Sequence, residues 1–270
     1  MEWSRVKTIM IGVFCVVNII LLVNYFSDSR TIFSIDAEAI ENTVIILEKH
    51  NIGVNHGIIP SGYQDMRTFE VEKKYETTQK LAEDLWETAD GTGLDYFNPQ
   101  HTRITDREFE YTAPRGVIPE FEILKAQKYA AKIVSSLGLD DKMTLESQTV
   151  YYGGITRVTF LQMYEQIAVL DTSLTFEFDE KGLISIKGDN WFCDGVLSGG
   201  IAAVKPITEI LVGFAVNFEF EERKTIIDIT QGYCLGDRWN KRITAIIPAW
   251  KICFDDGEEY YFDARNGDLL

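Results

Sequence analysis

Adjacent acidic residues are the first groups in this sequence that could do chemistry. Three pairs can be picked out, namely Asp140 with Asp141, Asp255 with Asp256, and Glu258 with Glu259. Two carboxyl groups at such a spacing can act as general acid and general base when the fold sets their pKa values apart. Each pair lies in a stretch with the composition of a turn, where neighbouring carboxylates are usually solvated. We therefore interpret all three pairs as turn residues.

Metal ligation and the common catalytic motifs give no stronger signal. Residues 90–95 have the composition of a calcium loop, but they lack its aspartate ladder and its distal glutamate. His50, His56 and His101 are scattered and do not share the i, i+4 spacing of a helical metal site. The sequence contains no nucleophile elbow, zinc-protease motif, phosphate loop or dinucleotide fingerprint. We predict a protein that is not an enzyme and that needs no cofactor or metal.

The four cysteines leave one alternative open. Cys15 lies in an apolar N-terminal run, and Cys193, Cys234 and Cys253 match no zinc spacing. Three thiols cannot all pair, so one disulfide, between Cys234 and Cys253 on neighbouring strands, competes with isolated buried thiols. Isolated buried thiols are the simpler interpretation.

The N-terminal run, residues 8–26, carries no charged side chain. As a helix it would be about 28 Å long, which is close to the thickness of the hydrocarbon layer of a membrane. Arg5 and Lys7 precede it, so we predict a cytoplasmic tail at 1–7, a transmembrane helix at 8–26 and the rest of the chain outside. A cleaved signal peptide would need a small-x-small site, and a buried core helix would show a polar face; the run shows neither.

An asparagine near the middle of the run indicates a helical partner. A carboxamide in hydrocarbon is unfavourable without a hydrogen-bond partner, and such residues often join transmembrane helices. The alternative is that Asn18 binds the carbonyl four residues earlier and contacts only lipid. The predicted contact face consists of Ile11, Cys15, Asn18, Leu22 and Tyr25, with Gly12 at its edge.

The charge of the remaining chain excludes one class of function. Of the charged residues, 24 basic and 41 acidic ones follow residue 26, which gives this part a net charge of −17. Such a surface repels nucleic acids and anionic lipid headgroups. With 46% apolar residues the chain has ample material for a folded protein, and we predict that it does not bind nucleic acid.

Periodicity and turn signals predict two extracytoplasmic domains of the α+β class, in which helices pack on antiparallel sheets. A cluster of proline and glycine at 114–119 separates the first domain, 34–113, from the second, 119–270. The second domain repeats one unit, a helix followed by an antiparallel meander. The expected helices are at 36–50, 77–88, 120–137 and from Pro206; the expected strands are at 54–60, 66–74, 102–112, 148–152, 156–162, 168–178, 183–190, 225–234, 243–254 and 259–264.

Aromatic residues in the predicted extracytoplasmic region are candidates for a contact with a partner protein. Trp191 and Phe192 are consecutive, so on a strand they would point to opposite faces and one of them would be exposed. Trp250, Tyr260 and Tyr261 fall on the last two strands, where such residues are usually part of the core. We predict a partner contact at Trp191 and Phe192.

Both ends of the sequence resemble one known family. The similar segments are Met1-Glu2-Trp3-Ser4-Arg5, Lys7-Thr8-Ile9 and Val17-Asn18-Ile19 at the start, and Gly232-Tyr233, Pro248-Ala249-Trp250-Lys251-Ile252, Tyr260-Tyr261-Phe262-Asp263-Ala264 and Gly267 at the end. In their order and spacing they resemble the YycI (WalI) proteins, which are membrane regulators of Gram-positive bacteria. The cysteines depart from that family's pattern.

The resemblance implies a single-pass membrane protein whose outer domains are related in fold to YycH and to PepSY-like modules. It also implies partners, a YycH-like regulator and a WalK-like (YycG) sensor histidine kinase, and a non-enzymatic role in a two-component system that controls cell-wall metabolism. The alternative is a tethered PepSY-like module that binds a ligand or inhibits a protease.

Overall fold

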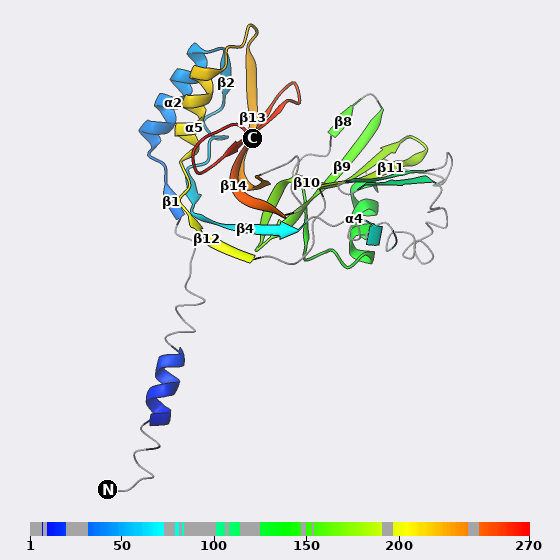
Figure 1. Ribbon diagram of the computed structural model, residues 1–270. Coiled ribbons are helices and arrows are strands. Elements are labelled where there is room, and N and C mark those ends of the chain that lie inside the picture. Colours follow the sequence, from blue (N-terminus) through cyan, green and yellow to red (C-terminus); the bar gives the residue numbers. More distant parts are fainter. Residues whose placement is uncertain are drawn as a thin grey trace.

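The computed structural model describes residues 7, 10–19, 32–72, 79–80, 83, 101–105, 108–113, 125–146, 150–152, 154–190, 197–236 and 243–270. Thirteen of the described strands form one mixed sheet, and the helices α2, α4 and α5 cover parts of it (Figure 1). Among the described residues, two large hydrophobic cores lie along this sheet, with a smaller cluster of Leu161, Leu170, Cys234 and Ala249 between them. We call the described residues of 32–72 and 197–270 the α2–α5 lobe and those of 101–190 the α4 lobe.

The α2–α5 lobe is built on an antiparallel meander. α5 (Ile207–Asn217) leads into β13 (Lys224–Leu235), β14 (Ile243–Phe254) and β15 (Glu259–Asp263), which pair in sequence order. Strands from the start of the chain extend this meander, because β2 (Ile52–Val54) pairs with β13, and β4 (Met66–Glu72) lies between β14 and β12 (Leu197–Ala202). β1 (Ile32–Ser34) and β3 (Gly62–Gln64) form a separate two-stranded sheet.

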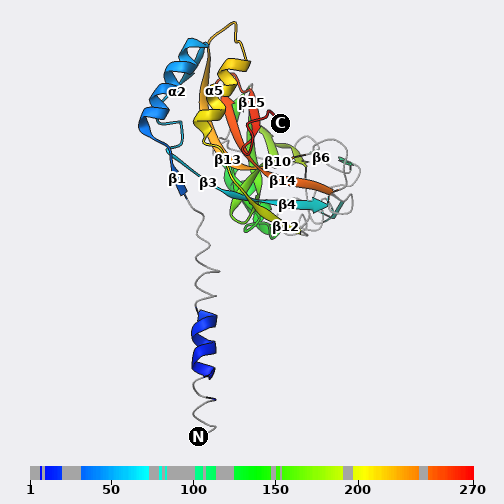
Figure 2. The ribbon, with the colours of Figure 1, turned by 60° about the vertical axis from the view of Figure 1, so that its left-hand side comes forward.

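α2 (Ala37–Lys49) lies beside α5 on the same side of the meander (Figures 1 and 2). Its start is set by Asp36, whose carboxylate accepts a hydrogen bond from the Glu38 amide. Its buried side chains are Thr43, Val44 and Leu47, at the spacing of one helical face. The core that the two helices cover is aromatic around Phe214, whose ring centroid lies 4.7–6.0 Å from those of Phe218, Phe220, Phe254, Tyr260 and Phe262.

The α4 lobe repeats the same plan. α4 (Ala126–Ser136) packs on one face of a meander of β9 (Ile155–Tyr164), β10 (Ile167–Asp179) and β11 (Gly182–Asp189). β6 (Glu108–Thr112) and β5 (Thr102–Ile104) continue the sheet beyond β11, while β7 (Met143–Leu145) and β8 (Val150–Tyr152) pair with β9. The helix buries Ala126, Ala130, Ile133 and Val134 against the sheet.

A narrow parallel contact joins the two lobes. β10 meets β13 at the pair Val169 and Tyr233, while the longer part of β10 belongs to the α4 lobe. The approach is close at Gly232, because a Cβ atom there would lie 2.7 Å from the Ala168 carbonyl oxygen and 2.7 Å from Leu170 Cγ. A side chain of any size would therefore push the strands apart.

The main features predicted from the sequence are confirmed. The chain is α+β, and a helix followed by an antiparallel meander occurs twice, after α4 and after α5. The sheet is mixed rather than antiparallel throughout, since β13 runs parallel to both β2 and β10. The expected domains 34–113 and 119–270 do not coincide with the two cores, because residues of 34–72 pack with α5 and residues of 101–113 pack with α4.

Two predicted strands were wrong in their limits. The strand expected at 54–60 lies instead at Ile52–Val54 (β2), because the Asn55 side chain accepts a hydrogen bond from the Gly57 amide and turns the chain. The strand expected at 102–112 is a hairpin of β5 and β6, in which the Thr105 amide donates to the Glu108 carbonyl. In the helix predicted at 77–88, residues 79, 80 and 83 are helical and the others lie outside the described residues.

The close approach at Gly232 gives a stability prediction. Gly232→Ala should lower the free energy of unfolding by about 1–3 kcal/mol, because the new methyl group collides with backbone and not only with a flexible side chain. Gly213→Ala is the control: it lies within α5 with open space around its Cβ position, and it should raise stability by about 0.5–1 kcal/mol. Urea unfolding of the full chain in detergent micelles, followed by near-ultraviolet circular dichroism, measures both. A neutral Gly232→Ala would contradict the tight junction.

Candidate functional site

Residues 10–19 of the predicted membrane helix are helical, and their apolar side chains are exposed. The exposed fractions range from 46% to 69% for Met10, Ile11, Val13, Phe14, Val16, Val17 and Ile19. The Asn18 Nδ2 atom donates to the Phe14 carbonyl oxygen at 3.0 Å, which is the bond expected if this amide turns to its own helix. A carboxamide has a second donor hydrogen and an acceptor oxygen, so this bond leaves capacity for a partner.

This described helix contains four members of the predicted contact face, Ile11, Gly12, Cys15 and Asn18. The space around the Cβ position of Gly12 is open to a distance of 4 Å. Leu22 and Tyr25 lie outside the described residues, as do Trp191, Phe192 and Cys193. Within the described part of the chain, no helix is both long enough and apolar enough to cross a membrane.

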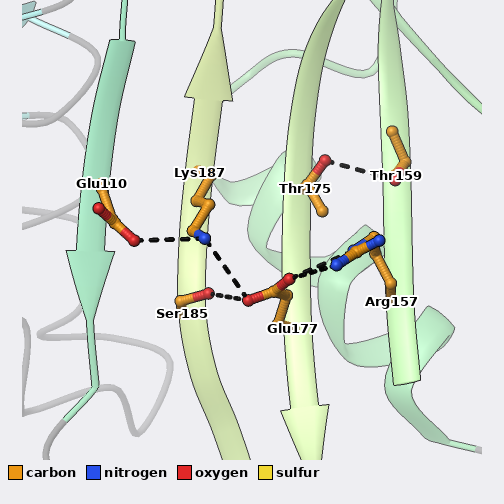
Figure 3. Close-up of polar contacts among 7 residues, drawn as sticks. All are labelled: Glu110, Arg157, Thr159, Thr175, Glu177, Ser185 and Lys187. Carbon is orange, nitrogen blue, oxygen red and sulfur yellow. Dashed lines mark hydrogen bonds and ion pairs between the residues drawn. The ribbon is translucent and has the colours of Figure 1, made fainter. Parts of the chain in front are cut away.

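The open face of the α4-lobe sheet carries a row of charged side chains. Figure 3 shows Glu110 of β6, Lys187 of β11, Glu177 of β10 and Arg157 of β9 in a line across four neighbouring strands. The Lys187 Nζ atom lies 3.3 Å from Glu110 Oε1 and 3.8 Å from Glu177 Oε2, and Arg157 donates to Glu177 Oε1 at 2.8 Å. We call these four residues the charged row. Apolar residues of the same strands face α4, so the alternation along each strand produces both faces.

Glu177 is the centre of the charged row. Burial alone would raise the pKa of its carboxyl group, but hydrogen bonds from Arg157 and Ser185 and the charge of Lys187 outweigh burial and lower that pKa below its ordinary value. The carboxylate therefore stays ionised and holds two cations on neighbouring strands. Beside it, the Thr159 and Thr175 hydroxyl groups form a further cross-strand hydrogen bond of 3.3 Å (Figure 3).

A buried ion cluster lies where the two lobes meet. Lys251 of β14 is 4% exposed, and its Nζ atom lies 2.8 Å from Glu146 Oε1 and 2.7 Å from Glu259 Oε1. Glu146 directly follows β7 of the α4 lobe, whereas Glu259 opens β15 of the α2–α5 lobe. Lys251 thus connects the lobes through one ammonium group. The Tyr261 hydroxyl donates to the second oxygen of Glu259 at 2.6 Å.

The protonation states of this cluster favour binding over catalysis. Burial alone would lower the pKa of Lys251, but its hydrogen bonds to Glu146 and Glu259 raise that pKa above the ordinary value, so the amine is protonated and cannot attack a substrate. Burial raises the pKa of the nearby Cys253 thiol to about 12, and a neutral thiol is a poor nucleophile. Burial and the neighbouring Glu259 also raise the pKa of Tyr261.

Two cavities flank the ion cluster. The larger, of about 720 Å³, is lined by residues of both lobes, among them Arg157 and Thr159 of β9, Lys251 of β14 and Glu259 of β15. The smaller, of about 440 Å³, also contains Lys251 and is bordered by Asp171, Asp189 and Tyr261. We call the larger cavity the inter-lobe cleft. Arg157 is a member of the charged row and also lines the inter-lobe cleft, so the charged row continues into the cleft.

The acidic pairs are exposed, as predicted, and Asp140, Asp141, Asp255 and Asp256 lie in turns, whereas Glu259 opens β15. Asp256 and Glu258 are not simply solvated, because each lies 2.7 Å from the Nζ atom of Lys224, and Glu259 holds Lys251. Asp255 accepts a hydrogen bond from the Thr225 amide, and Asp140 accepts one from the Ser135 hydroxyl. Lys224 and Thr225 belong to another part of the sequence, so spacing within the turn at 255–258 could not reveal their contacts.

Two of the cysteines and Trp250 are placed as predicted. Cys234 is buried and Cys253 is half-buried, and neither forms a disulfide, so the prediction of isolated thiols is confirmed for these two. Trp250 is fully buried and donates to the Lys205 carbonyl oxygen, as expected for a core residue. Among the described residues, no group of three or more histidine, cysteine or acidic side chains could hold a metal ion.

Comparison with known proteins supports the fold class that these contacts define. The crystal structure of an uncharacterized protein from Eubacterium rectale matches with a TM-score of 0.53 and 11% sequence identity, over 85% of this chain and 98% of that one. YycH from Bacillus subtilis aligns over 78% of this chain and 54% of its own at 12% identity, with a TM-score of 0.38, which is too low to argue from. No family model and no curated protein sequence matches the chain. The resemblance to the YycI family therefore stays a hypothesis.

The buried ion cluster gives a prediction with an internal control. Lys251→Met should lower the free energy of unfolding by about 1–3 kcal/mol, because Glu146 and Glu259 lose their common cation and are only partly exposed to water, at 24% and 40%. Lys224 also holds two carboxylates at 2.7 Å, but its partners Asp256 and Glu258 are 39% and 51% exposed, so Lys224→Met should change stability little. Urea unfolding of the full chain in detergent micelles compares the two.

A triple variant separates charge from packing in the same experiment. Lys251→Met combined with Glu146→Gln and Glu259→Gln removes the unpaired charges and should recover most of the stability that Lys251→Met loses. Equal losses for Lys251→Met and Lys224→Met would contradict the structural role of the cluster.

The lowered pKa of Glu177 predicts an acid-dependent step in stability. The ionised carboxylate stabilises the folded chain fully above its ordinary pKa of 4.5, and this contribution is lost as the pH falls through the lowered value. Glu177→Gln should therefore be less stable than the unchanged protein at neutral pH, and the difference should shrink towards about pH 2. Glu180→Gln, at an exposed turn position, is the control and should follow the unchanged protein. A difference that does not vary with pH would contradict this role.

Proposed function

We propose that this chain is a non-enzymatic membrane-anchored regulator that acts by binding other proteins. The observation that carries the proposal is the exposure of seven apolar side chains within residues 10–19, inside an uncharged run that extends from 8 to 26. Soluble proteins rarely leave such a surface in water, because its transfer to an apolar environment is favourable. We infer that the bilayer covers it, with residues 1–7 in the cytoplasm and the folded lobes outside.

The proposed partners are a sensor histidine kinase of the WalK type and a YycH-like regulator, in a two-component system that controls cell-wall metabolism. The resemblance of both chain ends to the YycI family supports this choice. The face of Ile11, Gly12, Cys15, Asn18, Leu22 and Tyr25 would contact partner helices. A regulator of this kind needs no reaction, only a difference in affinity for two states of the kinase.

A second candidate function rests on the inter-lobe cleft. A cavity of about 720 Å³ is large enough for a peptide segment or a small ligand. Its walls combine charged side chains with apolar ones such as Leu161 and Leu170. In this case the chain is a tethered ligand-binding or protease-inhibiting module, and its N-terminal helix serves only as an anchor.

One substitution tests the helix face. Asn18→Leu should reduce co-purification of the kinase from membranes by roughly threefold to thirtyfold, since interhelical hydrogen bonds contribute about 0.6–2 kcal/mol. Val13→Leu, on the opposite side of the helix, is the control and should leave co-purification unchanged. Expression of all variants is measured by immunoblotting. Unchanged co-purification with Asn18→Leu would remove this residue from the contact.

A domain exchange separates the two candidate functions. Replacement of residues 8–26 by an unrelated transmembrane helix should abolish kinase association if the helix recognises its partner. A chain that is only tethered keeps its activity after the exchange, and mass spectrometry of the co-purified material would then identify a ligand or protease.

A further inference from the structure

The strands β1 and β12 lie end to end along one edge of the α2–α5 lobe. β1 pairs with β3, whose Gln64 amide and carbonyl bond to the Gln231 side chain of β13, on the edge of β3 away from β1. β12 pairs with β4, whose other edge pairs with β14. The β13–β14 hairpin therefore borders one edge of β3 and β4, and β1 and β12 border the other. Both views show them along the same margin (Figures 1 and 2).

This edge exposes apolar side chains. Ile32 is 76% exposed, Ile201 is 61% exposed and Phe33 is 37% exposed, with its ring stacked on that of Tyr63. Register places Ile32 opposite Gln64 and Ile201 opposite Arg67, so the two isoleucines lie beside positions only three residues apart. All three side chains of β1 are exposed. β3 is held to the lobe through Gln231, but the apolar side chains of β1 remain exposed and are available for a contact outside the lobe.

The length of chain before β1 indicates what this contact is. Only five residues, 27–31, separate the apolar run from Ile32. Six peptide steps reach at most about 20 Å, so β1 lies within that distance of the hydrocarbon layer. The headgroup region on each side of this layer is about 5–7 Å thick. The connection thus confines β1, at one end of the β1–β12 edge, to the neighbourhood of the membrane surface.

We propose that the β1–β12 edge docks onto the bilayer, with Ile32, Phe33 and Ile201 in the headgroup boundary. This inference rests on the membrane anchor of the proposed function. A lipid surface fits better than a partner strand, because each strand is short and the edge is interrupted between them. The interruption is at Asp65, whose carboxylate accepts a hydrogen bond from the Val204 amide. The docking fixes the orientation of the lobes, with α2 and α5 directed away from the membrane.

Photo-crosslinking tests this contact in the full chain. The photoreactive residue p-benzoylphenylalanine replaces Phe14, Ile32, Ile201 or Val216 in turn, and each protein is reconstituted in phosphatidylcholine vesicles. Position 14 reports the anchor. Position 216 is the control, because Val216 is 64% exposed but lies near the far end of α5. After illumination, mass spectrometry identifies lipid and protein adducts at each position.

Positions 14, 32 and 201 should each give at least about tenfold more lipid adduct than position 216, because only they reach acyl chains. Lipid adducts at 14 but not at 32 or 201 would overturn the docking and leave the anchor standing. An absence of lipid adducts at 14 would overturn the anchor, and the docking with it. Protein adducts at 32 and 201 would overturn the docking in favour of a second copy of the chain.

Discussion

The relative position of the two lobes depends on the ion cluster around Lys251 together with the apolar contacts at the same junction. Each lobe has its own apolar core, and apolar contacts also cross the junction, because Leu161 and Leu170 of the α4 lobe pack with Cys234 and Ala249 of the other lobe. Lys251 adds a directional contact, because its ammonium group binds one carboxylate from each lobe. A buried charge with two partners tolerates only a small range of geometries, since a displaced lobe would leave an unpaired charge in a poorly solvated place.

The same constraint shapes the inter-lobe cleft. Lys251 and Glu259 of one lobe and Arg157 of the other line this cleft, so its shape follows from the lobe junction. Gly232 is the second determinant, because it lets β13 approach the Ala168 carbonyl oxygen. A ligand or partner that separated the lobes would have to break the Lys251 contacts. The cleft is therefore a place where binding could be coupled to a change in lobe geometry.

Much of the fold could be predicted from local patterns, but the lobes could not. The Asp36 cap, the turn at Asp179 to Gly182 and the alternation along β10 are local signals, and each matches the structure. The pairing of β4 with β14, and of β6 with β11, joins residues far apart in sequence, which periodicity does not encode. The proline and glycine cluster at 114–119 thus suggested a domain boundary, although residues before it complete both cores. The sequence around Glu146 does not indicate its role, because that role is an ion pair with Lys251, which is far away in the sequence.

The net charge of the chain limits how its folded lobes can approach a membrane. The chain after residue 26 has a net charge of −17, so long-range electrostatics repels it from anionic headgroups rather than drawing it down. An attractive contact must then come from short-range apolar burial, which is available along the edge where Ile32 and Ile201 are exposed. The acidic surface elsewhere disfavours the other orientations. In the proposed membrane-anchored arrangement, repulsion over most of the surface and one apolar edge close to the anchor would together favour a single orientation of the lobes and leave the cleft to solvent and partners.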